Sequence, residues 1–152
     1  MLRISKNASL VVSLLLTILF FIVLLLAMVV LPRFVQLISP VALRPLAMRD
    51  GVLIMAAGYL ILVLAALADA LLFRLLLLIR RGEVFTARSV ALIRGVSWCA
   101  VAVSLVFLWM TWYYSVALVL SFTAVLLGLC LRVVKNVIEE ATAIKAENDL
   151  TV

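Results

Sequence analysis

Residues 10–31 read LVVSLLLTILFFIVLLLAMVVL and contain no charged side chain. A helix needs about 20 apolar residues to cross the hydrocarbon core of a bilayer, so this stretch is long enough to span it. Three further apolar stretches, almost free of charge, follow at residues 51–73, 95–113 and 116–134. None of them alternates between apolar and polar residues, as the strands of a membrane barrel do. The sequence therefore predicts an all-α integral membrane protein, a four-transmembrane-helix bundle.

The composition agrees with this prediction. Of the 152 residues, 69% are hydrophobic and only 13% are charged, which is more apolar surface than a soluble domain of this size can bury. Arg3 and Lys6 before an apolar run resemble the start of a secretory signal, but the run is longer than a typical signal core. No small-x-small cleavage site precedes Pro32, so we expect a retained first helix within a single membrane domain, residues 1–152.

The basic residues are distributed unevenly between the connections. Ten lie in the amino-terminal segment, around the second connection, or at and beyond the end of the fourth stretch, where Arg132 is included. Three lie in the first connection: Arg33, Arg44 and Arg49. Because cytoplasmic loops of membrane proteins are enriched in Lys and Arg, both termini are predicted to be cytoplasmic. The net charge of +6 does not form one basic patch, so nucleic-acid binding is not expected.

The connections carry their own signals. Three prolines make residues 32–50 an expected irregular or short helical segment at the outer surface. In the cytoplasmic loop, residues 80–90, Gly82 is a plausible helix terminator and Thr86 can cap the next helix. The apolar stripe of the fourth stretch continues past Lys135, so this helix is predicted to extend into the cytoplasm. The acidic tail, residues 135–152, is expected to fold back on the basic loop, with residues 150–152 lying as a short strand beside residues 84–86.

Small and hydroxyl residues recur at helical spacing in every stretch, which lets helix backbones approach closely in lipid. These stripes predict the faces that pack together, although a substrate path is an alternative reading. Their members are Ser9, Ser13 and Thr17; Gly58, Ala65 and Asp69; Ser97, Ser104 and Thr111; and Ser121, Gly128 and Arg132.

Asp69 is the only acidic residue inside an apolar stretch, and a charge there is costly without a partner. Counted from the outer ends at about 1.5 Å per residue, Asp69, Arg94 and Arg132 reach a similar depth of roughly 24 to 27 Å. We therefore expect an intramembrane ion pair between Asp69 and Arg132 or Arg94. The pair is expected to be a structural link, with a proton- or ligand-coupled role as the alternative.

The parts that most enzymes need are missing from this sequence. It contains no histidine, no Cys-x-x-Cys pair and no glycine-rich phosphate loop, and both cysteines, Cys99 and Cys130, lie in apolar stretches. We therefore expect no enzymatic activity, no cofactor and no metal site.

The second connection, IRRGEVFT at residues 79–86, is followed by LIRG at residues 92–95, and the chain ends KAENDLTV at residues 145–152. Together these segments resemble the bacterial membrane family called domain of unknown function 2975, from about the second stretch onward. The resemblance implies a multi-pass protein of the bacterial cytoplasmic (inner) membrane, and a regulatory partnership with a helix-turn-helix protein. It also implies a shared cytoplasmic interaction surface formed by Gly82, Phe85, Thr86, Asp149, Leu150 and Thr151.

The expected function is a non-enzymatic membrane regulatory or interaction protein whose loop and tail contact a soluble partner. One alternative is a small oligomeric transporter or resistance protein coupled through Asp69. Another is an accessory subunit or immunity factor that shields a second membrane protein. Apart from the lipid bilayer and such a partner, a homo-oligomer is compatible with the sequence.

Overall fold

A computed structural model describes residues 6–82 and 85–150. Within these ranges the chain forms four long α-helices and one short 3-10 turn, without a strand. The elements are α1 (Lys6–Ile38), η1 (Ser39–Val41), α2 (Met48–Arg80), α3 (Ala87–Met110) and α4 (Val116–Leu150). All four helices are long and apolar enough to cross a membrane. The predicted all-α class with four spanning helices is therefore confirmed.

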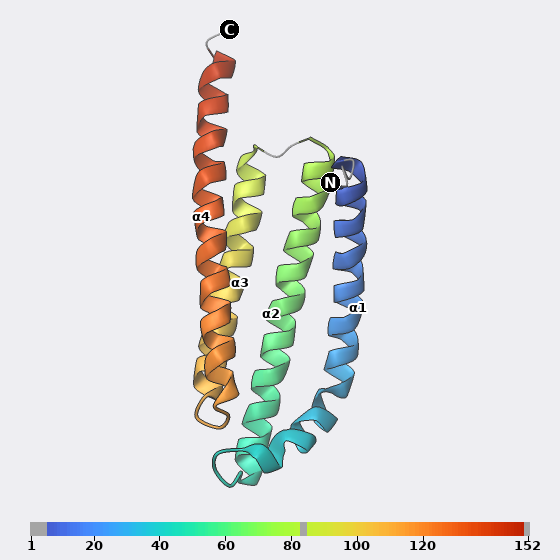
Figure 1. Ribbon diagram of the computed structural model, residues 1–152, viewed down its shortest axis with the longest axis vertical. Coiled ribbons are helices and arrows are strands. Elements are labelled where there is room, and N and C mark those ends of the chain that lie inside the picture. The colour runs from blue at the N-terminus through green and yellow to red at the C-terminus, as the bar shows by residue number, and fades with distance from the viewer. Residues whose placement is uncertain (1–5, 83–84, 151–152) are drawn as a thin grey trace, which may run out of the picture.

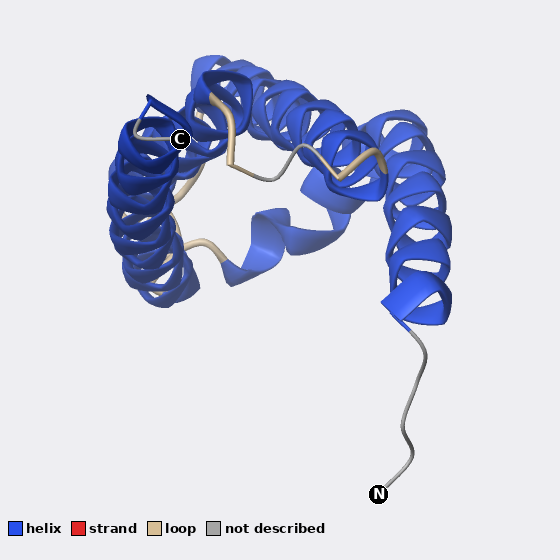
Figure 2. Ribbon diagram, turned by 90° about the horizontal axis from the view of Figure 1, so that it is seen from above, coloured by secondary structure: helices blue, strands red, loops and turns tan. Residues whose placement is uncertain are grey.

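The helices stand side by side in chain order and form an open arc (Figures 1 and 2). The main contacts join α1 to α2, α2 to α3 and α3 to α4, while α1 and α4 lie at opposite ends of the row. In a closed four-helix bundle α1 would also pack against α4, whereas here the helices form an open row (Figure 2). The difference has a physical reason, because lipid covers the large apolar side chains of these two outer helices as well as protein would.

The start of α1 and the end of α4 lie at the same end of the molecule as the connection between α2 and α3 (Figure 1). The first and third connections lie at the opposite end. At the end that holds the termini, α4 projects beyond every other helix (Figure 1). Its 35 residues correspond to about 52 Å of helix, against an apolar bilayer core of about 30 Å.

The first helix is longer than predicted, because it continues through Pro32 to Ile38. The lower part of α1 bends across the end of the molecule (Figure 1). Proline lacks the N–H that would donate to the carbonyl one turn earlier, so one hydrogen bond of the helix is lost. The loss of a single bond can kink a helix without ending it. The irregular segment expected from residue 32 is thus confined to η1 and residues 42–47.

The most extensive helix contact joins α3 and α4, and hydroxyl groups form hydrogen bonds across it. Ser97 Oγ donates to the Gly128 carbonyl at 2.9 Å, and Ser121 Oγ donates to the Ser104 carbonyl at 2.9 Å. All four residues are buried. Ser97 and Ser104 of the third predicted stripe and Ser121 and Gly128 of the fourth therefore form one packing interface.

Gly128 makes this close approach possible. A Cβ atom placed there would lie 3.3 Å from Cγ2 of Val101 and 3.5 Å from the Ser97 carbonyl oxygen. Any larger side chain would therefore push α3 and α4 apart and stretch the bond between Ser97 and Gly128.

We expect Gly128→Leu to lower the free energy of unfolding in detergent by about 1 to 3 kcal/mol, the usual cost of overpacking. Gly51→Leu is the matched control, because nothing lies within 4 Å of a Cβ at that position. Unfolding followed by circular dichroism would measure both. Equal losses in the two variants would contradict the assigned interface.

Candidate functional site

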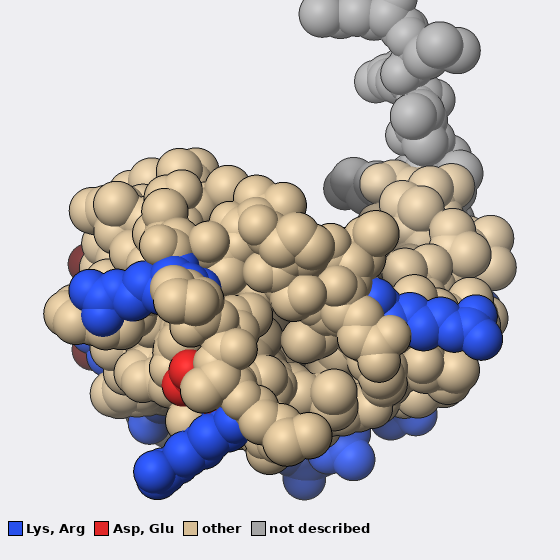
Figure 3. Space-filling view, turned by 90° about the horizontal axis from the view of Figure 1, so that it is seen from below, with Lys and Arg blue, Asp and Glu red and all other residues tan. Residues whose placement is uncertain are grey.

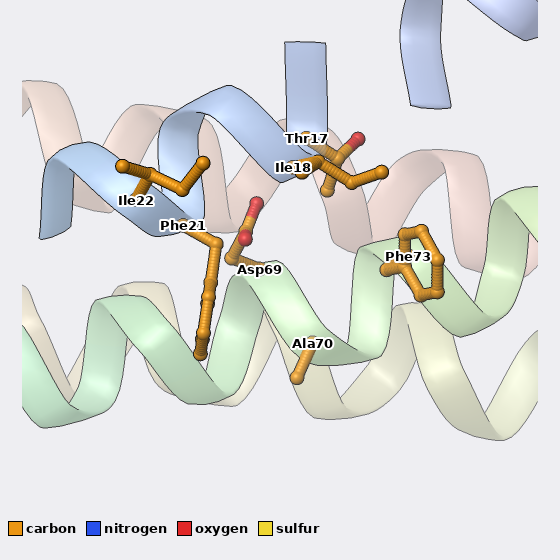
Figure 4. Close-up of a pocket in the computed structure, with 7 residues that line it drawn as sticks. All are labelled: Thr17, Ile18, Phe21, Ile22, Asp69, Ala70 and Phe73. Atoms are coloured by element: carbon orange, nitrogen blue, oxygen red, sulfur yellow. The ribbon is translucent and has the colours of Figure 1, made fainter. Parts of the chain in front are cut away.

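Asp69 lies where α1 and α2 pack together. It is only 7% exposed, and it points toward Thr17 and Phe21 of α1 (Figure 4). Two grooves lie beside it, of about 270 and 540 Å³, and both are lined by Thr17 and Asp69 together with mainly apolar side chains. The structure therefore places a carboxyl group in an apolar cleft between two helices.

Asp69 has no partner among the residues that the structure describes. No ion pair or hydrogen bond joins its carboxyl group to another described side chain. The hydroxyl of Thr17, which lines both grooves, donates instead to the Ser13 carbonyl at 2.7 Å. Asp69 is thus a buried acid that its own neighbours do not neutralise.

The two arginines predicted to pair with Asp69 lie in a different interface. Arg94 and Arg132 line one pocket between α3 and α4, where an Arg94 nitrogen is 4.0 Å from Glu139. The guanidinium of Arg132 lies over the ring of Trp98, 5.1 Å from its centre. The structure brings the two arginines together but does not bring Asp69 to them, so the predicted intramembrane ion pair is not formed.

The faces of α2 explain why this pair does not form. Gly58, which shares a face with Asp69, packs against Leu31 of α1. The opposite face carries Leu71, whose Cδ1 atom would lie 2.8 Å from a Cβ placed at Gly95 of α3. Gly58 and Asp69 share a face, as predicted, but this face looks toward α1 and away from α3 (Figure 4).

The turn signals predicted for the connection between α2 and α3 are confirmed where the structure describes them. Gly82 follows α2 with a φ of 81°, the left-handed conformation that glycine adopts without strain. Thr86 is the cap of α3, and its side chain accepts a hydrogen bond from the Ser89 amide at 3.3 Å. Phe85 beside it is 45% exposed. The loop therefore presents an apolar ring next to a rigid helix start.

The predicted return of the tail to this loop is not seen in the described part of the tail. α4 remains helical through Asp149 and Leu150, and its end points away from the loop (Figure 1). Leu150 is therefore not part of an extended strand. Thr151 and Val152 of the expected strand, and Val84 opposite them, lie outside the described residues. A surface shared by loop and tail thus stays a prediction.

The sequence analysis did not identify a polar cluster at the opposite end of the molecule. There Asp50 accepts a hydrogen bond from the Ala47 amide at 3.0 Å and another from the Tyr113 hydroxyl at 3.2 Å. The Leu43 amide donates to the Tyr113 carbonyl at 2.9 Å, and Arg44 lies 5.0 Å from the centre of the Trp112 ring. Burial and the adjacent Asp50 carboxylate raise the pKa of Tyr113 above its ordinary value.

This polar cluster ties the first connection to the turn between α3 and α4. Basic side chains stand apart around this end of the molecule, with an acidic group among them (Figure 3). One local signal was available in the sequence, because Asp50 is the third residue of α2 and acids favour that position. Its pairing with Tyr113, 63 positions away, had no local signal.

A family model described as "Protein of unknown function (DUF2975)" matches residues 3–152. The chain belongs to this family. The match covers nearly the whole chain, including the first helix and the proline-containing connection, which contributed little to the resemblance seen in the sequence. No curated protein and no solved structure matches the chain. Family membership thus assigns no activity to the chain.

Because Asp69 has no described partner, its replacement by an apolar residue is expected to stabilise the fold. Asp69→Leu should raise the free energy of unfolding in detergent by about 1 to 3 kcal/mol, because a charge in the apolar part of a helix is costly. Asp50→Leu is the contrasting variant and should lower stability, because that carboxylate caps α2 and binds Tyr113. Titration with a denaturing detergent measures both, and a loss of stability in Asp69→Leu would restore the ion-pair hypothesis.

Proposed function

We propose that this protein is a non-enzymatic membrane regulatory protein that binds a soluble partner through the projecting part of α4. The observation that carries the proposal is the length and surface of this helix. Roughly 20 residues from Val116 suffice to cross the hydrocarbon core, so the helix beyond about residue 135 extends past it.

The projecting part of α4 is amphipathic. Val134, Val137 and Ile144 are 47%, 60% and 55% exposed and share one face with Ala141. The opposite face carries Lys135 and Glu139, which form an ion pair with each other. An apolar stripe on a helix that leaves the bilayer needs a protein surface to cover it, and a groove lined with apolar residues fits such a helix.

The proposed orientation places this projecting helix in the cytoplasm of a bacterial cell, with both termini on the inner side of the inner membrane. It is supported by the excess of Lys and Arg at the end of the molecule that carries the termini. The partner proposed from the family resemblance is a helix-turn-helix regulator, which the membrane protein would hold at the membrane surface.

A photoreactive amino acid placed at position 144 is expected to crosslink one soluble protein in living cells. Ile144→Asp should then reduce co-purification of that same protein by at least tenfold, because it puts a charge into the apolar contact. Ala143→Asp is the matched control, since it adds the same charge to an exposed neighbouring position about 100° around the helix. Crosslinking to an integral membrane protein instead would support an accessory or immunity role.

A second candidate function is transport by an oligomer. It is favoured by the carboxyl group of Asp69, which lies in a cleft and has no partner among the described residues. An acid of this kind can take up a proton or a cation during transport. Under this reading, flux of a lipophilic cation into proteoliposomes should fall to the background of empty liposomes in Asp69→Asn. Unchanged flux in that variant would exclude Asp69 as the coupling group.

A further inference from the structure

Three arginines line a single groove of about 510 Å³ between α2 and α3: Arg74, Arg81 and Arg88. Arg74 lies in α2 and Arg81, seven residues later, is the cap of its carboxyl end, so the two lie on the same side of the helix. Arg88 is the second residue of α3. The turn that contains Gly82 brings the two helix ends together. The groove is lined by the end of α2 and the start of α3, and these lie at the same end of the molecule as the start of α1 and the end of α4 (Figure 1).

None of these three guanidinium groups forms an ion pair with another residue in the described ranges. The arginines of the neighbouring interface differ, since Arg94 approaches Glu139 and Arg132 covers the ring of Trp98. Three like charges that face one groove repel each other. A shared anion would remove this repulsion.

The rest of the groove is apolar. Leu77 and Leu78 of α2 and Ala91 and Leu92 of α3 lie between the arginines. The positive end of the α3 helix dipole, at its amino terminus, adds to the potential there. A ligand that fits this surface therefore has an anionic head and an apolar chain.

Guanidinium groups bind phosphate oxygens in pairs, which gives arginine its preference for phosphate over other anions. Basic pockets between membrane helices on the cytoplasmic side are suited to anionic lipid headgroups. We propose that the groove binds the phosphate headgroup of an anionic phospholipid, with Arg74, Arg81 and Arg88 holding the phosphate and the leucines lying along an acyl chain.

The test uses the full-length protein in a neutral detergent, with native mass spectrometry counting bound lipids during titration with phosphatidylglycerol or phosphatidylcholine. The wild type should retain phosphatidylglycerol preferentially. Replacing all three arginines by glutamine should weaken that binding about a hundredfold, since each charge contributes about fivefold near a membrane surface. Arg80→Gln is the matched control, because Arg80 is exposed and adjacent but does not line the groove.

Replacement of the three arginines by lysine separates charge from geometry. This variant keeps the charge and loses paired contacts, so its affinity should lie between those of the wild type and the glutamine variant. Undiminished retention in the glutamine variant, or an equal loss in Arg80→Gln, would overturn the proposal. Inorganic phosphate distinguishes the source of the anion: full displacement of the lipid by millimolar phosphate would assign the site to free phosphate and overturn the lipid assignment.

Discussion

The structure depends on close backbone approach between α3 and α4, because in lipid an apolar side chain gains little by leaving one apolar neighbour for another. Two helices in lipid are held together by short-range dispersion forces and by hydrogen bonds for which no water competes. Ser97 and Ser121 supply such bonds, and Gly128 gives the space that they need. The remaining helices are then placed in order, each against its neighbour in the chain.

Much of the fold could be read from the sequence, since the length of an apolar run and the side chains at a turn act locally. The four spans, the glycine at position 82 and the capping threonine at position 86 are of this kind. The extension of α1 through Pro32 was missed, because proline forbids one hydrogen bond and does not by itself decide whether the helix resumes.

The candidate site was predicted less well, for a different reason. Helical periodicity correctly grouped Asp69 with Gly58, yet periodicity states which residues share a face and not which helix that face meets. Asp69 turned out to face α1, whereas Arg94 and Arg132 belong to the contact between α3 and α4. The face of α2 that meets α3 is instead the one that carries Leu71, which packs against Gly95. This is a contact between two helices, and no local sequence pattern encodes it.

The row-like order of the helices also bears on how the protein is made. Every extensive helix–helix contact joins two helices that are consecutive in the chain. Folding therefore requires few contacts between residues far apart in the sequence. As the ribosome delivers each new crossing to the membrane, that crossing can settle against the one delivered just before it. Each helix therefore finds its packing partner as soon as the next helix is inserted, and none depends on a contact with a helix that is synthesised much later.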